Sequence, residues 1–358
     1  MSKVLTTEQR EQAGSDSYNR FEYQVHWIVC HIIGRLQEDA ECIVFCEFHD
    51  DMAEFSPSNQ QYQFFQIKTK EDSSDWTIAE MSKREKKKTG GYKKSFLGFI
   101  FYNYLVFGSE CSHCHFVSNN DFDNDVLLWQ TYVEDGKSLQ TENIELYEKI
   151  KNRIKEEFSD DMPSNFDSVF EEFIQNTFVH KSELQLTTYE SQAMGKFFNH
   201  LADKNIPSNT ANLIFQQLLN DVRKKSKERI RVPISMRRLV EKKGVDVAQV
   251  GKKIDDNIKS GGNYDAFRNY LVTQSLSDKD VNRIIAAKTL HDARWLDVND
   301  VKYQEIVVAL RKVVSTYCKS SETNGVCDEL NNLCIQELRN RSLISESLDK
   351  SLVEVLYY

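Results

Sequence analysis

Hydrophobic residues near the start of the chain recur at helical spacing. Ser15, Asp16 and Ser17 stand before this segment and are suitable capping residues. The apolar positions that repeat every three or four residues are Phe21, Val25, Ile28, Val29, Ile32, Ile33 and Leu36. This pattern predicts an amphipathic helix over residues 15–36.

Two segments with the composition of β-strands follow this helix. Residues 42–51 and 62–70 are rich in β-branched and aromatic side chains, and the first segment ends in Asp50 and Asp51. The polar cluster between them, residues 56–59, favours a turn. We therefore predict two strands joined by a loop, with the acidic residues at the end of the first strand.

Gln66 and Lys68 lie on one face of the second predicted strand, because side chains alternate along a strand. Phe64 shares that face, whereas Phe65 and Ile67 occupy the other. An amide and an amine therefore stand side by side on a strand that is otherwise suited to burial.

The remaining apolar patterns predict an α/β fold. They indicate a buried helix over 95–106, a core strand that includes 115–118, helices over 141–158 and from 166 onward, and a strand over 179–188. From about residue 242 the pattern is helical.

Acidic residues beside a Q-x-K strand suggest a metal-dependent phosphodiesterase site. Mg²⁺ prefers oxygen ligands, which Asp51, the Gln66 amide and the main-chain carbonyl of Ile67 can supply. Lys68 is placed to orient water and to offset charge in the transition state. Glu47 is either a second ligand or faces away. The pattern alone is weak, since lysines on strands commonly extend from a sheet edge.

The most basic stretch of the chain follows the Q-x-K segment closely. We predict that it contacts DNA phosphates, although such runs are often only solvated surface. Its basic residues are Lys83, Arg84, Lys86, Lys87, Lys88, Lys93 and Lys94. A second basic zone around Arg223–Arg238 either flanks DNA or marks a solvated helix end.

Cys111, Cys114 and His115 match the spacing of haem attachment. The start of the chain is polar and lacks a signal-peptide core, and no second ligand pair for zinc is evident. We therefore interpret this segment as a core strand, expect no membrane association, and expect a cytoplasmic protein.

A series of short motifs occurs in a familiar order along the first two-thirds of the chain. They are Arg20–Gln24, Glu47 with Asp51, Gln66–Lys68, Trp76–Thr77, Lys94–Gly98 and Phe116–Asn119. The series resembles the restriction-endonuclease-like nuclease domain of the CD-NTase-associated double-stranded DNA endonucleases, effectors of bacterial antiphage systems.

The resemblance implies a PD-(D/E)xK restriction-endonuclease-like core with helical additions and a helical C-terminal module. It implies that Asp51 and Lys68 are catalytic, that Gln66 replaces the usual third acid, and that Gln24 assists. The expected cofactor is Mg²⁺ or Mn²⁺. Arg20 departs from the glycine that the family usually has at that position.

Length and charge shape the expected organisation. With 358 residues, we expect an endonuclease domain over 1–240 and a helical module for oligomerisation or partner docking over 241–358. The net charge of −9 is unusual for a DNA-binding protein and suggests that DNA affinity depends on assembly or on a partner. Cutting both strands needs two active sites, so an active dimer or tetramer is expected.

The C-terminal module distinguishes between related defence systems. At about a hundred residues it is short for the sensor domain of the cyclic-nucleotide effectors on the usual scale of domain sizes. The chain more closely resembles the nuclease subunit of a Lamassu-type system, which implies SMC-like ATPase partners that hold it inactive until sensing. The alternatives are a non-catalytic DNA-binding scaffold with a decayed nuclease fold, and a Mrr-like modification-dependent restriction enzyme.

Overall fold

A computed structural model gives the fold over residues 13–38, 41–204, 206, 208–261, 264–274, 276–295, 301–320, 326–343 and 350–358. The described residues divide into two compact units. The first comprises those of Met1–Phe197 with Val222–Val250, and the second those of Phe198–Asp221 with Gly251–Tyr358. The functional division at residue 240 stays a prediction.

The first unit is built on a mixed six-stranded sheet of order β5-β4-β3-β2-β1-β6. The strands are β1 (Ile43–Phe48), β2 (Asp50–Ser56), β3 (Gln61–Lys68), β4 (Cys111–Ser118), β5 (Thr177–Lys181) and β6 (Gly244–Asp246). Strands β1, β2 and β3 form an antiparallel meander, β6 pairs antiparallel with β1, and β3, β4 and β5 run parallel.

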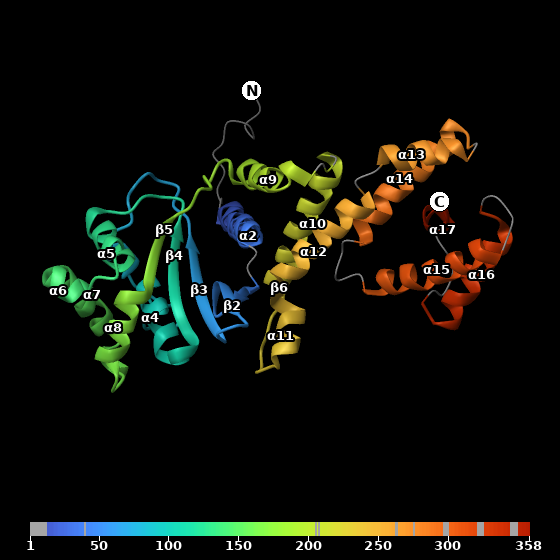
Figure 1. The fold of residues 1–358 in the computed structure, drawn as a ribbon. Helices are drawn as coiled ribbons and strands as arrows, with labels where there is room; N and C mark the ends of the chain where they lie inside the picture. Colours follow the sequence, from blue (N-terminus) through green and yellow to red (C-terminus); the bar gives the residue numbers. More distant parts are fainter. Residues whose placement is uncertain are drawn as a thin grey trace, which may run out of the picture. The chain divides into compact units, whose positions relative to one another are not determined.

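Helices cover both faces of this sheet (Figure 1). On one face α2 (Ala13–Gln37) packs against β3, where Phe65 contacts Trp27 and His31. On the other face α4 (Phe96–Phe107) packs against the same strand, where the ring of Phe64 stacks on Phe107. The alternation predicted for residues 62–68 is thereby confirmed.

The remaining helices of the first unit include those predicted over residues 141–158 and from 166 onward. They are α3 (Ile78–Met81), α5 (Asn124–Glu134), α6 (Leu139–Glu142), α7 (Ile144–Glu157), α8 (Phe166–Asn176), α9 (Tyr189–His200) and α11 (Met236–Lys243). Buried residues of α4, α5, α7 and α8 form one core with the sheet. The strand predicted over 179–188 is wrong in its bounds, because β5 ends at Lys181 and the chain then turns toward α9.

The prediction of one strand over residues 42–51 is also wrong. The chain reverses at Glu47 and His49, which both adopt left-handed backbone conformations with φ values of 51° and 63°. Asp50 therefore begins a new strand that pairs back on β1, with Phe48 opposite Asp50. Asp51 lies at the start of β2 rather than at the end of β1. The hairpin contains no glycine, proline or asparagine that would have marked it.

All the secondary structure described in the second unit is helical. Three helices, α9, α10 (Ser208–Lys227) and α12 (Val247–Gly261), have residues in both units. The others are α13 (Tyr264–Thr273), α14 (Asp278–Trp295), α15 (Val301–Ser320), α16 (Asp328–Asn340) and α17 (Lys350–Tyr357). Leu310, Leu330 and Leu338 are fully buried in a core that α15, α16 and α17 share.

Across the described part of the chain, none of the helices combines the length and the apolar character that spanning a membrane requires.

Candidate active site

Asp51 and Lys68 meet on the α4 face of the sheet. Lys68 Nζ donates to Asp51 Oδ2 at 2.8 Å, and the main-chain N–H of Ile67 donates to the same oxygen at 2.7 Å. The ladder between β2 and β3 ends at the pair Met52 and Phe65. Beyond this pair, the Asp51 carboxylate accepts the Ile67 N–H that a backbone carbonyl of β2 would otherwise accept. This hydrogen bond fixes the carboxylate beside residues 66–68.

Gln66 is buried beside this pair, with 3% of its surface exposed. Its Oε1 atom has no hydrogen-bond partner among the described residues. A buried amide oxygen without a partner costs free energy, and such a cost is tolerated where a ligand completes the site. The Lys68 ammonium also lies 5.5 Å from the centre of the Phe96 ring.

Gln24 reaches the site from helix α2. Its Nε2 donates to the main-chain carbonyl of Ile67 at 3.0 Å. This contact holds the C-terminal end of β3 against the helix and orients a carbonyl that the sequence suggested as a metal ligand. Gln24 therefore acts on the backbone of the site rather than through the Asp51 carboxylate.

Two further carboxyl groups surround Asp51. Burial and the negative charge of Asp51 raise the pKa of Glu47 to about 7, while Lys243 and Lys68 oppose this shift. The same two causes raise the pKa of Asp50 to about 8, and Asn103 on α4 donates to its Oδ2 at 3.3 Å. Asp50 was not among the predicted site residues. Both groups hold protons more tightly because burial and the neighbouring Asp51 charge disfavour their ionised forms, and the nearby lysines offset this only in part.

The N-terminus of α4 is occupied by an internal carboxylate. Glu157 accepts hydrogen bonds from Ser95 N at 3.0 Å and from Ser95 Oγ at 2.5 Å. A Cβ atom at Gly98 would lie 2.1 Å from Glu157 Oε1, so only glycine leaves room for this contact. The Lys94–Gly98 motif therefore builds a capped helix start next to Lys68.

The predicted basic loop is a turn closed by backbone hydrogen bonds. Lys87 N donates to Gly91 O at 2.9 Å, and Lys93 N donates to Glu85 O at 2.8 Å. Lys83, Lys86, Lys87, Lys88 and Lys93 are exposed, whereas Arg84 and Lys94 are partly buried. Arg84 lies over the ring of Tyr92, Lys94 lies over Phe158, and Lys93 pairs with Glu85.

Several cations of the second basic zone have structural contacts. Arg223 pairs with the buried Glu22 of α2 at 2.6 Å. Lys243 is buried and donates to Cys46 O at 3.0 Å, next to the hairpin that carries Glu47. Lys225 is buried as well and donates to Glu241 O at 3.1 Å. This burial could not be predicted from the sequence, because lysines are seldom enclosed.

The donor atoms fit a hard cation held by mixed oxygen ligands. No group of three or more His, Cys, Asp or Glu side chains in the described ranges has the geometry to hold a metal ion. Asp51 Oδ1 has no hydrogen-bond partner among the described residues, and Gln66 Oε1 has none either. Together with the Ile67 carbonyl they form the kind of oxygen set that Mg²⁺ accepts.

Comparison with known proteins identifies a family and a similar solved structure. The family described as Cap4, dsDNA endonuclease domain, matches residues 12–226. No curated protein sequence matches the chain. A structure of the Moraxella osloensis Cap4 SAVED/CARF-domain containing receptor is similar at 16% identity and a TM-score of 0.35, over 57% of this chain and 43% of that chain.

Proposed function

The chain belongs to the family of Cap4 dsDNA endonuclease domains and is a DNA endonuclease, and from this premise we propose that Asp51, Gln66 and Lys68 form its catalytic centre. The observation that carries the proposal is the 2.8 Å contact between Lys68 Nζ and Asp51 Oδ2, beside the partnerless amide oxygen of Gln66. In this assignment the core is of the PD-(D/E)xK type, with glutamine at the third position.

Each residue has a separate task in this mechanism. Asp51 holds the Lys68 ammonium through Oδ2 and keeps Oδ1 for a cation. Lys68 donates a hydrogen bond to the attacking water or to a phosphate oxygen, where negative charge develops in the transition state. Gln24 fixes the Ile67 carbonyl through its 3.0 Å hydrogen bond.

The proposed cofactor is Mg²⁺ or Mn²⁺. Asp51 Oδ1, Gln66 Oε1 and the Ile67 carbonyl would hold it, and Glu47 lies close enough for its pKa to respond to Asp51. When bound, a divalent cation supplies Lewis-acid polarisation of the phosphodiester. The excess of carboxyl groups at this end of the sheet favours a cation there.

Cleavage of supercoiled plasmid tests the catalytic assignment. We expect Lys68→Ala and Asp51→Asn each to lower the nicking rate at least about 100-fold, because a preorganised charge contact acts on the transition state. Lys149→Ala is the matched control, since Lys149 forms an exposed ion pair with Asp125 on the helical side of the domain. Nicking by Lys68→Ala at the rate of the unchanged protein would refute the assignment.

Double-stranded DNA is the proposed substrate, bound in part by the exposed lysines of the 83–94 loop. Because a duplex has two strands, two copies of the site must act together, and a homodimer or homotetramer is the proposed active form. Light scattering with and without a DNA duplex tests this. Double-strand cleavage by a strictly monomeric protein would contradict it.

The proposed biological role is that of a nuclease effector in antiphage defence, of the Lamassu type. The support is the helical second unit with its own apolar core, which suits docking to a partner such as an SMC-like ATPase. Co-expression with candidate ATPase subunits followed by purification tests the partnership. Tight binding of a cyclic oligonucleotide that is also required for cleavage would exclude the Lamassu assignment.

A further inference from the structure

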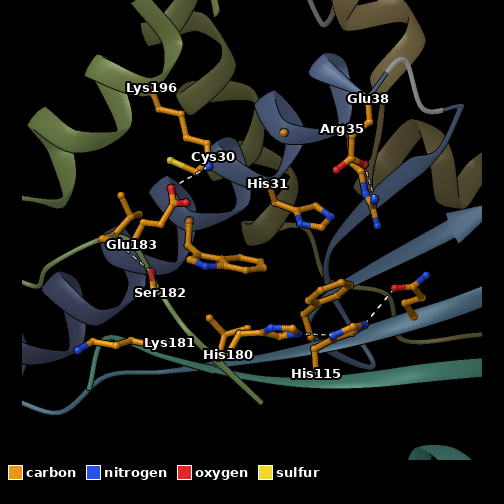
Figure 2. Close-up of a pocket in the computed structure, with 16 residues that line it drawn as sticks. Cys30, His31, Arg35, Glu38, His115, His180, Lys181, Ser182, Glu183 and Lys196 are labelled. Carbon is orange, nitrogen blue, oxygen red and sulfur yellow. Dashed lines mark hydrogen bonds and ion pairs between the residues drawn. The ribbon is translucent and has the colours of Figure 1, made fainter. Parts of the chain in front are cut away.

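A pocket of about 350 Å³ lies on the α2 face of the sheet (Figure 2). Helix α2 contributes Trp27 and His31, β3 contributes Phe65, β4 contributes His115, and β5 contributes His180. All of these residues belong to the first unit. The strand alternation places Phe65 and His115 on the opposite side of the sheet from Gln66 and Lys68, so the pocket is separate from the proposed catalytic centre.

The pocket has aromatic walls on the helix and on the sheet. The rings of Trp27 and His31 stack with centroids 5.4 Å apart and an interplanar angle of 21°. The rings of Phe65 and His115 stack at 4.2 Å and 8°. In Figure 2, His31 lies over His115 and His180. Phe65 also contacts Trp27 and His31 at centroid distances of 5.7 and 4.9 Å, so a planar, polarisable ligand would lie beside this aromatic cluster rather than between two separate walls.

A hydrogen-bonded chain of polar groups runs along the sheet wall. His115 Nδ1 lies 2.9 Å from His180 Nε2, and His115 Nε2 lies 3.0 Å from Gln63 Oε1. His180 Nδ1 and the Gln63 amide nitrogen have no recorded partner in the described part of the chain. The wall therefore ends in one imidazole nitrogen and one amide donor, which match the edge of a nitrogen heterocycle.

The electrostatics of the pocket favour an uncharged ligand. Burial lowers the pKa of His180, and burial together with neighbouring imidazoles lowers the pKa of His115 well below its usual range. Both rings are thus neutral at physiological pH. The lining cations are each held by a carboxylate: Arg35 by Glu54 and Glu38, Lys196 by Glu183, and Lys181 by Asp121.

Gly34 keeps part of the pocket open. It lines the pocket from within α2, and a Cβ atom added there would meet no atom within 4 Å. Glycine inside a helix is less favourable than alanine. The open space beside residue 34 therefore comes with a loss of local helix stability. The same position offers a way to fill the pocket without displacing the backbone.

We infer that this pocket binds an uncharged planar nitrogen heterocycle of nucleobase size. Its volume lies at the small end of the usual range for ligand sites, which suits a base or nucleoside. The base could be presented as a free nucleoside or as an unstacked base of single-stranded DNA. This inference does not depend on the catalytic assignment, because binding is measured without metal and without cleavage.

Calorimetric titration of the full chain with adenosine, guanosine, cytidine and thymidine tests the inference. We expect saturable one-to-one binding of at least one nucleoside, weakened at least tenfold in Gly34→Leu, which fills the pocket, and in His180→Phe, which removes the ring nitrogens. Gly34→Ala and His113→Gln are the matched controls and should bind normally. His113 shares the strand and face of His115 but does not line the pocket.

Further measurements identify the source of the base and test whether each variant is folded. Thermal melting establishes that each variant is folded. The base is assigned to DNA if a single-stranded oligonucleotide binds more tightly than any nucleoside and Gly34→Leu weakens that binding. The inference is overturned if no nucleoside or oligonucleotide binds in a Gly34-dependent manner. It is also overturned if nucleoside monophosphates bind far more tightly than nucleosides, because the ligand would then be anionic.

Discussion

Lys68 Nζ and Asp51 Oδ2 lie 2.8 Å apart across two adjacent antiparallel strands, and the Ile67 N–H shares the same oxygen. One carboxylate therefore fixes both the amine that we assign to catalysis and the backbone next to it. Because Asp51 sits where the β2–β3 ladder stops, the contact also closes the end of the sheet.

Asp51 should contribute to stability as well as to activity. Asp51→Ala leaves a partly buried ammonium and a backbone N–H without their acceptor, and we expect a loss of about 2 kcal/mol in the free energy of unfolding. Urea unfolding measures it. Lys68→Met, which removes the charge and keeps the alkyl chain, should cost less. An Asp51→Ala protein as stable as the unchanged chain would show that the contact is not formed.

Gln66→Glu should change metal dependence. A carboxylate in place of the buried amide adds a negative charge to an already acidic cluster, which destabilises the metal-free fold, but it also adds a stronger ligand for Mg²⁺. We expect a lower melting temperature without metal and a larger increase on adding Mg²⁺. Gln66→Leu should lose the Mg²⁺ response. Equal Mg²⁺ responses in all three proteins would argue against Gln66 as a ligand.

The raised pKa values of Glu47 and Asp50 predict a pH dependence. In the folded state these groups keep protons up to about pH 7 and 8, whereas in the unfolded chain they lose them near pH 4. The folded state thus binds more protons in this interval, so their contribution makes the free energy of unfolding fall as pH rises from about 4 to 8.

Urea unfolding between pH 5 and 8.5 measures this effect. Glu47→Gln should flatten the dependence, and Mg²⁺ should flatten it in the unchanged protein by replacing protons. Glu85→Gln is a suitable control, because Glu85 lies in the exposed loop and its pKa is lowered by Lys93. An unchanged slope in Glu47→Gln would contradict the raised pKa.

The basic loop should contribute a salt-dependent part of DNA binding. Lys86, Lys87 and Lys88 are exposed on a turn that backbone hydrogen bonds close. Replacing all three by glutamine should reduce the slope of log Kd against log salt by about 2 to 3, since each phosphate contact contributes about 0.9. Fluorescence anisotropy with labelled duplex measures the slope. Lys137, Lys149 and Lys155, replaced together, provide the control.

Glu54 should be a strong determinant of stability at the edge of the pocket. Glu54 is 5% exposed, and its carboxylate receives two hydrogen bonds from Arg35 and lies 2.5 Å from His31 Nε2. Burial favours the protonated form, but the contacts with His31 and Arg35 outweigh it and lower the pKa of Glu54. Its contribution is therefore present above pH 4.5 and is lost as pH falls through the lowered value. Glu54→Gln should cost about 2 kcal/mol at pH 7, and clearly less at pH 3.

The sequence predicted the common face of Gln66 and Lys68 because strand parity is a strong local rule. Gln66 and Lys68 are two residues apart on a strand that packs on both faces, so their common orientation followed directly. Asp51 was assigned correctly to the neighbourhood of Lys68 but to the wrong strand. The hairpin at Glu47 and His49 depends on left-handed residues that carry no turn signal, and tertiary packing selects them.

The pocket could not have been predicted in the same way. His31, His115 and His180 come from three elements that the fold alone brings together, and β5 was placed too late in the chain. The alternation of His113 and His115 on one strand was the single local sign of a polar face. The burial of Lys225 and Lys243 could not be predicted either, because each ammonium donates to a backbone carbonyl that no sequence pattern marks.

The left-handed conformation of Glu47 links the stability of the hairpin to the charge near Asp51. A left-handed non-glycine residue stores on the order of 1 kcal/mol of backbone strain, which glycine would relieve. The chain instead keeps an acidic residue there, next to Asp51. Glycine at position 47 would relieve this strain, but it would also add backbone freedom to the unfolded chain and remove a carboxyl group whose pKa responds to Asp51. The bend therefore couples the local backbone conformation to the charge around Asp51.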